Sequence, residues 1–174
     1  MKNQIIVNVN LKEEAEEQIN KLAKRIEFYV SEYTVEILCL KMNRQEFIVP
    51  EYQRNKVWDN NRQSKFIESV IMGLPIPFLF FWERSDGKLE IVDGSQRLRT
   101  IQEFINNELI LSDLRALTKI NGFKFGDLLP SRQMKIKNRS IRGILLSEHA
   151  DATVRYDLFE RINTGSKTAT AAEV

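Results

Sequence analysis

The stretch LEIVDGSQRLRTIQEFI, residues 89–105, decides the fold, because it passes from a strand pattern through a glycine turn into a helix pattern. Residues 89–92 form a short apolar run that is typical of a strand. Gly94 permits the positive φ of a tight turn. Leu98, Ile101, Phe104 and Ile105 then recur at the three- and four-residue steps of one helical face. The sequence therefore predicts strand, turn and helix, with the turn at the N-terminus of the helix.

The segments before this stretch add a hairpin and a helix. Phe78 to Trp82 is a second strand-like run, and Asp86-Gly87 between the two runs is a strong hairpin signal. Asp59 can cap a helix that ends at Gly73, before two prolines. Its apolar face is the set Phe66, Ile67, Val70 and Ile71.

The N-terminal third of the chain predicts one long helix and two strands. From Asn10 to Tyr33 apolar residues recur at helical steps, and Asn10 with Glu13 stand where a capping box would. Val35 to Leu40 is a β-branched and apolar run, and Phe47 to Val49 precedes a proline, so both favour extended structure.

The C-terminal third predicts mixed elements. Short strands are expected at Leu109–Leu111 and within Phe123–Leu129, a helix at Ser131–Asn138 and a strand at Ser140–Leu146. A last helix is expected from Asp151 to a stop at Asn163-Thr164-Gly165. The fold class that follows is α+β: a small, mixed, strongly bent sheet flanked by helices, with a helical C-terminal portion.

The amino-acid composition excludes some classes of function but does not identify one. A chain of 174 residues, 43% of them hydrophobic, fits a single domain, which we expect to belong to a longer protein. Its net charge of +2 gives a weak global field, so nucleic-acid binding must depend on local clusters. One cysteine and one histidine exclude an internal disulfide and a four-ligand Cys/His zinc site, and cytoplasmic localisation is expected.

The turn at residues 93–99 carries residue types that suit phosphate. A helix N-terminus presents unpaired backbone N–H groups, Ser95 and Gln96 add neutral donors, and Arg97 and Arg99 offer guanidinium forks. Each charge-assisted hydrogen bond there contributes on the order of 1.5 to 3 kcal/mol. The alternative is structural: Asp93 caps the helix, and both arginines are solvated.

Three ordered motifs resemble one known family. The string Ile91-Val92-Asp93-Gly94-Ser95-Gln96-Arg97-Leu98-Arg99-Thr100 resembles the D-G-Q-Q-R signature of the ParB/sulfiredoxin-like superfamily, in the branch at the N-terminus of GmrSD-type restriction proteins. Pro50-Glu51-Tyr52-Gln53-Arg54 with Trp58 resembles the P-x-Y-Q-R-x-x-x-W element of that branch. Phe159-Glu160-Arg161-Ile162-Asn163-Thr164-Gly165 resembles its F-x-x-I-N-T-G element. Ser95 departs from the signature, where glutamine is usual.

The resemblance implies nucleotide binding, with hydrolysis in several relatives, coupled to restriction of modified or foreign DNA in bacterial phage defence. Cutting in such relatives is done by a C-terminal HNH-type nuclease. The implied partners are a nucleoside triphosphate with Mg²⁺, and DNA either directly or through a nuclease. The implied catalytic residues are Asp93 and Arg97, and the implied nucleotide-binding residues are Gln53, Arg54, Gly94, Ser95, Gln96, Arg97 and Arg99.

Two rival functions remain open from the sequence. One is a non-catalytic module that recognises modified DNA, and the other is a ParB-like nuclease that acts on DNA itself. A basic run with no acid among its eleven residues could contact DNA phosphates, or could be a solvated helix face. Its members are Arg132, Lys135, Lys137, Arg139 and Arg142.

Overall fold

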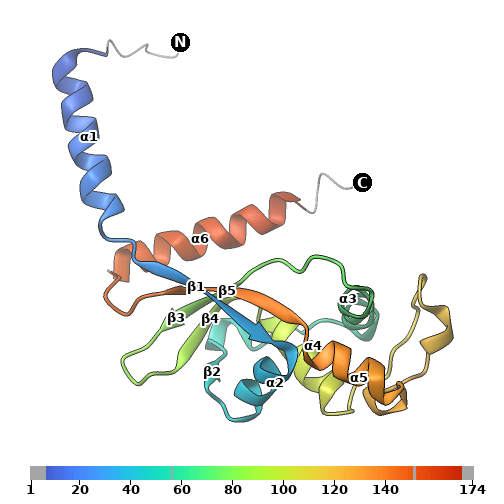
Figure 1. Cartoon of the computed structure of the whole chain (residues 1–174). Helices are drawn as coiled ribbons and strands as arrows, with labels where there is room; N and C mark the ends of the chain where they lie inside the picture. The colour runs from blue at the N-terminus through green and yellow to red at the C-terminus, as the bar shows by residue number, and fades with distance from the viewer. Residues whose placement is uncertain (1–6, 56, 151, 170–174) are drawn as a thin grey trace. The chain divides into compact units, whose positions relative to one another are not determined.

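A five-stranded mixed sheet carries the predicted hairpin (Figure 1). Its strands are β1 (Phe28–Thr34), β2 (Phe47–Ile48), β3 (Leu79–Glu83), β4 (Leu89–Asp93) and β5 (Ser140–Leu146). They lie in the order β1-β5-β3-β4-β2. The β3–β4 pair is antiparallel, whereas β5 is parallel to β3 and β2 is parallel to β4. The α+β class predicted from the sequence is confirmed.

The structure, a computed structural model, describes residues 7–55, 57–150 and 152–169. Its helices are α1 (Val9–Ala23), α2 (Val35–Asn43), α3 (Asn60–Met72), α4 (Ser95–Ile105), α5 (Pro130–Lys137) and α6 (Ala152–Ala169). Residues 29–148 form one compact unit, and residues 1–28 with 149–174 form another. No helix in the described part of the chain is both long and apolar enough to cross a membrane.

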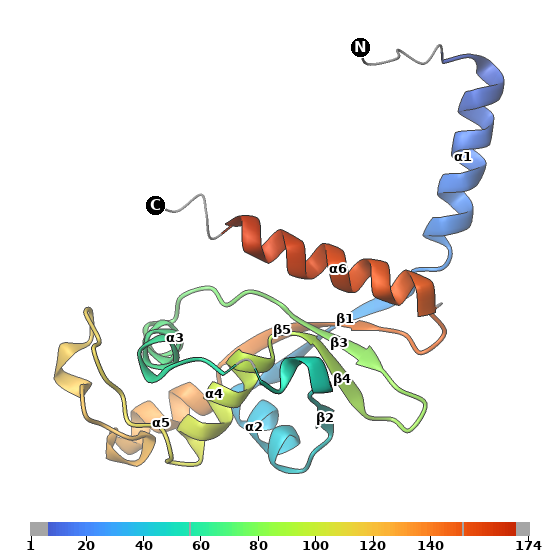
Figure 2. The same cartoon turned by 180° about the vertical axis from the view of Figure 1, so that it is seen from behind.

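The core of the larger unit lies between the sheet and two helices. Figures 1 and 2 show α2 and α4 side by side on one face of the sheet. Phe81 and Ile91, which are cross-strand partners, are fully buried there, together with Leu38 of α2 and Leu98 of α4. The apolar stripe read from residues 98–105 is therefore the face by which α4 is held, and this packing fixes the turn that precedes it.

The helix and hairpin signals near the turn are confirmed. Asp59 accepts a hydrogen bond from the Arg62 amide at 2.8 Å and caps α3, which ends at Gly73 in the left-handed conformation. Gly87, with φ of 78°, closes the β3–β4 turn. α5 and β5 occupy the expected ranges, and β2 lies within the expected Phe47–Val49 segment.

The long N-terminal helix was predicted wrongly. α1 ends at Ala23, and the segment expected to continue it is β1. Phe28 to Thr34 is rich in aromatic and β-branched residues, which prefer strands. In this segment that preference outweighs the helical spacing of the apolar residues. Asn8, not Asn10, caps α1 by accepting from the Leu11 amide at 2.8 Å.

The strand expected at Val35–Leu40 is instead α2. Thr34 caps it by accepting from the Ile37 amide at 3.2 Å. The buried residues Val35, Leu38, Cys39 and Met42 stand at positions i, i+3, i+4 and i+7. That helical spacing is present in the sequence, but the β-branched start of the run concealed it.

The strands expected at Leu109–Leu111 and Phe123–Leu129 are absent. The segment 106–129 is a long loop with two short 3₁₀ turns, Thr118–Ile120 and Phe125–Asp127. Leu111 exchanges two backbone hydrogen bonds with Gly122 and Phe123, which is too short a ladder to make strands.

The stop expected at Asn163-Thr164-Gly165 is also wrong, because the backbone of α6 continues to Ala169. The glycine signal did not end the helix, since a glycine can be accommodated within a helix at a cost of about 1 kcal/mol. The predicted N-terminal residue of this helix, Asp151, lies outside the described residues.

Candidate functional site

The β4–α4 turn begins with an irregularity in the hairpin. Phe80 pairs with Asp93 and Phe81 pairs with Ile91, so Val92 has no partner on β3. A bulge of this kind frees a backbone carbonyl and bends the end of the strand. Gly94 follows with φ of 105° and serves as the N-cap of α4.

Gly94 is required by space as well as by conformation. A Cβ atom at this position would overlap the buried Leu79 side chain and lie 3.2 Å from Arg97 Nη2. A side chain is disfavoured both by the positive φ and by this close approach. The turn therefore holds the start of α4 tightly against β3.

The 50–58 segment is fastened to this turn by three hydrogen bonds. Gln53 Nε2 donates to the freed carbonyl of Val92 at 2.9 Å. The Trp58 amide donates to Gln96 Oε1 at 3.0 Å. Arg99 Nη1 donates to the Arg54 carbonyl at 3.2 Å. The P-x-Y-Q-R-x-x-x-W and D-G-S-Q-R segments, about forty residues apart in the sequence, thus form one seam.

Each glutamine of the seam keeps one buried polar atom that no described residue satisfies. These atoms are Gln53 Oε1 and Gln96 Nε2. Gln53 is only 8% exposed. A buried polar atom without a partner costs about 1 to 3 kcal/mol, so such atoms are uncommon and frequently mark a site for a ligand or water. The seam offers one acceptor and one donor to such a molecule.

The N-terminus of α4 adds a set of donors beside the seam. Gly94 has no side chain with which to cap the helix. Within the described residues, no acceptor faces the amide groups of Ser95, Gln96 and Arg97. Aligned N–H groups at the positive end of a helix dipole attract anions.

Arg97 is turned away from the seam and toward the protein. Its guanidinium donates to the Pro77 carbonyl, to the Phe78 carbonyl at 3.1 Å and to the Asp93 carboxylate at 3.1 Å. The side chain is 11% exposed. Burial lowers the pKa of Arg97, and the Asp93 carboxylate opposes that change. In this arrangement Arg97 pairs with Asp93 and holds the Pro77–Phe78 segment.

Among the described residues of the two seam motifs, Arg54 and Arg99 keep guanidinium donors available for a ligand. Arg54 Nε donates to the Val49 carbonyl at 3.4 Å, and Arg99 makes the single bond to the Arg54 carbonyl. A guanidinium has five N–H donors, so both retain donors for an anion. Arg54 is exposed and Arg99 is half-buried.

The described residues do not fit a magnesium ion held by the protein. No group of three or more His, Cys, Asp or Glu side chains gathers among them. Asp93, one of the two implied catalytic residues, has its carboxylate paired with Arg97. A Mg²⁺ ion at this site would therefore be bound by the phosphates it accompanies.

The basic run does not act as one surface. Arg139 donates to the carbonyls of Ser69, Val70 and Leu74 and so caps the C-terminus of α3. Lys137 pairs with Glu36 at 3.6 Å, and Arg142 pairs with Glu32 at 2.9 Å. Arg132 and Lys135 are exposed on α5. Within the described part of the chain, Arg132 and Lys135 are the two members of the run that pair with no acid and cap no helix.

Replacing Arg139 with methionine is expected to lower the free energy of unfolding by about 1.5 to 3 kcal/mol, because it removes charge-assisted bonds to helix-end carbonyls. Burial also lowers the pKa of Arg139, as expected for a guanidinium directed inward. Urea unfolding measures the loss. Arg132→Met, on the exposed face, should change stability by less than about 0.5 kcal/mol; equal effects of the two substitutions would contradict the capping role.

The sequence did not indicate which backbone groups take part in the seam, namely the Val92 carbonyl and the Trp58 amide. No residue type marks these groups, because their exposure depends on the register between strands and on tertiary packing. The motif residues Gln53 and Gln96 were found, and their contacts could not be. The side chains of Asn163, Thr164 and Gly165 lie outside the described residues.

Comparison with known proteins places most of the chain in one family. Residues 35–174 match the family described as GmrSD restriction endonuclease, N-terminal domain. No curated protein and no solved structure matches the chain. The matched range contains both motifs of the seam and the whole of the β4–α4 turn.

Proposed function

The chain belongs to the family of N-terminal domains of GmrSD restriction endonucleases, and on this premise we propose that it binds a nucleoside triphosphate at the seam between Gln53 and Gln96 and thereby regulates DNA restriction in anti-phage defence. The observation that carries the proposal is the pair of buried glutamine atoms without partners, beside a helix N-terminus that has no side-chain cap.

The parts of the seam match the parts of a nucleotide. Phosphate oxygens accept hydrogen bonds, and the first-turn amides of α4 with the guanidinium groups of Arg54 and Arg99 are donors with capacity to spare. Base and ribose carry both donors and acceptors, which Gln53 Oε1 and Gln96 Nε2 complement. Ser95, at the first position of α4, brings a short hydroxyl group that is only 6% exposed.

Binding rather than hydrolysis is the function that the geometry supports. The hydrolytic roles expected of Asp93 and Arg97 require a carboxylate and a guanidinium that face the phosphates, but these groups are bound to each other and to the Pro77–Phe78 carbonyls. Nucleotide occupancy would act as a signal, since it would add contacts across a seam that three hydrogen bonds already join. Cutting of DNA falls to a nuclease outside the described residues.

The decisive variant is Gln96→Glu. Glutamate keeps an oxygen for the Trp58 amide but replaces the free donor with a carboxylate oxygen that repels phosphate. We expect nucleotide affinity to fall at least tenfold, because one donor is lost and a like charge is introduced. Calorimetric titration with ATP, GTP, CTP and UTP, each with Mg²⁺, measures the change.

The matched control is Gln18→Glu, the same substitution on the exposed surface of α1. It should leave nucleotide affinity unchanged. Circular dichroism of both variants reports whether the fold is kept. If the unsubstituted chain binds none of the four nucleotides, or if Gln96→Glu binds them as well as Gln18→Glu does, the proposed function is wrong.

A further inference from the structure

The long loop 106–129 and helix α3 enclose two hollows that the nucleotide proposal does not use. The first, of about 670 Å³, is lined by Asn61, Lys65, Glu68, Asp113, Leu114, Arg115 and Asn121. The second, of about 520 Å³, is lined by Ile71, Met72, residues 116–120, Leu128 and Arg132. Along α3 the linings follow one another, whereas along the loop residues 116–120 of the second hollow lie between Arg115 and Asn121 of the first, so the same loop lines both hollows.

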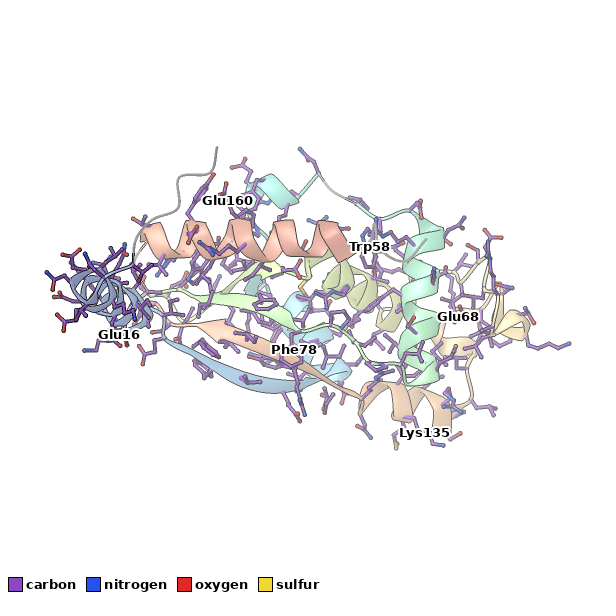
Figure 3. All side chains as sticks on the ribbon, turned by 90° about the horizontal axis from the view of Figure 1, so that it is seen from above. Glu16, Trp58, Glu68, Phe78, Lys135 and Glu160 are labelled. Carbon is purple, nitrogen blue, oxygen red and sulfur yellow. The ribbon has the colours of Figure 1, made fainter. Side chains whose placement is uncertain are left out.

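Hydrogen bonds fix this loop on α3, although it has little secondary structure. Glu68 Oε1 accepts from the amides of Ala116 and Leu117 at 2.9 and 2.8 Å, at the ridge between the hollows. Figure 3 shows Glu68 on the side of α3 that faces the loop. Asn60 Nδ2 donates to the Ile110 carbonyl at 3.0 Å. A loop of this length that is held so closely is usually functional.

Four cations line the two hollows: Lys65 and Arg115 in the first, and Lys119 and Arg132 in the second. All four are exposed, and none has an ion-pair partner among the described residues. Two acids share the linings. Glu68 has an oxygen engaged by two amides, and Asp113 is exposed. The surface therefore carries an excess of unpaired positive charge, in a chain whose net charge is only +2.

We propose that this surface, the α3–loop groove defined by Lys65, Arg115, Lys119 and Arg132, binds the phosphate backbone of duplex DNA. Lys65 comes from α3, Arg115 and Lys119 from the loop, and Arg132 from α5, so three elements contribute cations to the groove. Four exposed cations distributed over two hollows suit a repeating array of negative charge, whereas the hollows lack a buried cation that would favour a single small anion. The groove thus replaces the α5–β5 run as the DNA-contact surface, and it retains Arg132 from that run.

The test is DNA binding by the full chain across a range of KCl concentrations, followed by the fluorescence anisotropy of a labelled duplex. In the unsubstituted chain, log affinity should fall linearly with log salt. Changing Lys65, Arg115, Lys119 and Arg132 together to alanine should weaken binding more than tenfold and reduce the salt slope by about 3.6, which is about 0.9 for each phosphate contact. The four side chains are exposed, so the variant should fold normally.

A control variant removes the same formal charge elsewhere, by alanine at Lys12, Lys21, Lys24 and Lys88, all of which are exposed. It should keep the salt slope. The proposal is overturned if the chain binds no duplex at low salt, as it would if the groove bound an acidic protein instead. It is also overturned if both variants lose the same affinity and the same salt slope. Nucleotide titration of the groove variant should be unchanged, so failure of this proposal is distinguishable from failure of the nucleotide proposal.

Discussion

Gly94→Ala should destabilise the chain by about 3 to 5 kcal/mol, which is a large part of the stability of a typical domain. Two costs combine. A non-glycine residue in an unfavourable backbone region costs about 1 to 3 kcal/mol, and overpacking a buried contact costs a similar amount. The overlapped neighbour is Leu79, which is 1% exposed and belongs to the core. Urea unfolding, monitored by circular dichroism, measures the loss.

The control for this prediction is Gly87→Ala in the β3–β4 turn. Gly87 has φ of 78°, and no atom lies within 4 Å of a Cβ placed there. The substitution therefore carries the backbone cost without the steric one, and about 1 kcal/mol is expected. If Gly94→Ala proves no worse than Gly87→Ala, the tight contact between the turn and β3 is not as described.

Arg97→Met should cost about 3 to 5 kcal/mol, because it leaves Asp93 and the carbonyls of Pro77 and Phe78 without their donor. Methionine keeps much of the packing, so the loss isolates the guanidinium. Asp93→Asn in the same chain removes the unpaired charge. The double variant should therefore be more stable than the sum of the two single losses predicts.

Arg99→Met is the comparison for the Arg97 substitution. It lies two residues further along α4 and makes one backbone hydrogen bond, so a loss below about 1 kcal/mol is expected. The two substitutions should affect nucleotide affinity in the reverse order from stability. Arg99→Met should weaken nucleotide binding directly, whereas Arg97→Met should affect it only by destabilising the fold. An Arg97→Met chain that unfolds like the unsubstituted chain but no longer binds nucleotide would assign Arg97 to the ligand instead.

The elements nearest the turn were predictable because their signals are local. Asp59 as a cap, Gly73 as a stop and Asp86-Gly87 as a hairpin turn each act through their own backbone. The N-terminal third was not predictable in the same way. A helical spacing continued by chance through β1, and the β-branched start of α2 suggested a strand, because tertiary packing overrides weak local preferences there.

The candidate site was predictable in composition and not in geometry. Gln53, Arg54, Gln96 and Arg99 do come together at one seam. Arg97 was expected to bind phosphate, and in the structure it donates to the carbonyls of Pro77 and Phe78, a contact with a distant segment that its own sequence neighbours do not reveal. The type of a residue indicates which hydrogen bonds its side chain can make. Which partner it meets depends on the bulge at Val92 and on how the 50–58 segment packs against the β4–α4 turn.

Nucleotide binding at the seam can be observed residue by residue in a two-dimensional ¹⁵N NMR titration of the full chain with each nucleoside triphosphate and Mg²⁺. We expect saturable shifts of the backbone amides of Ser95, Gln96 and Arg97 and of the side-chain amides of Gln53 and Gln96, while the amides of α1 stay unchanged. Absence of shifts at these five groups with every nucleotide, or shifts confined to other parts of the chain, would contradict binding at the seam.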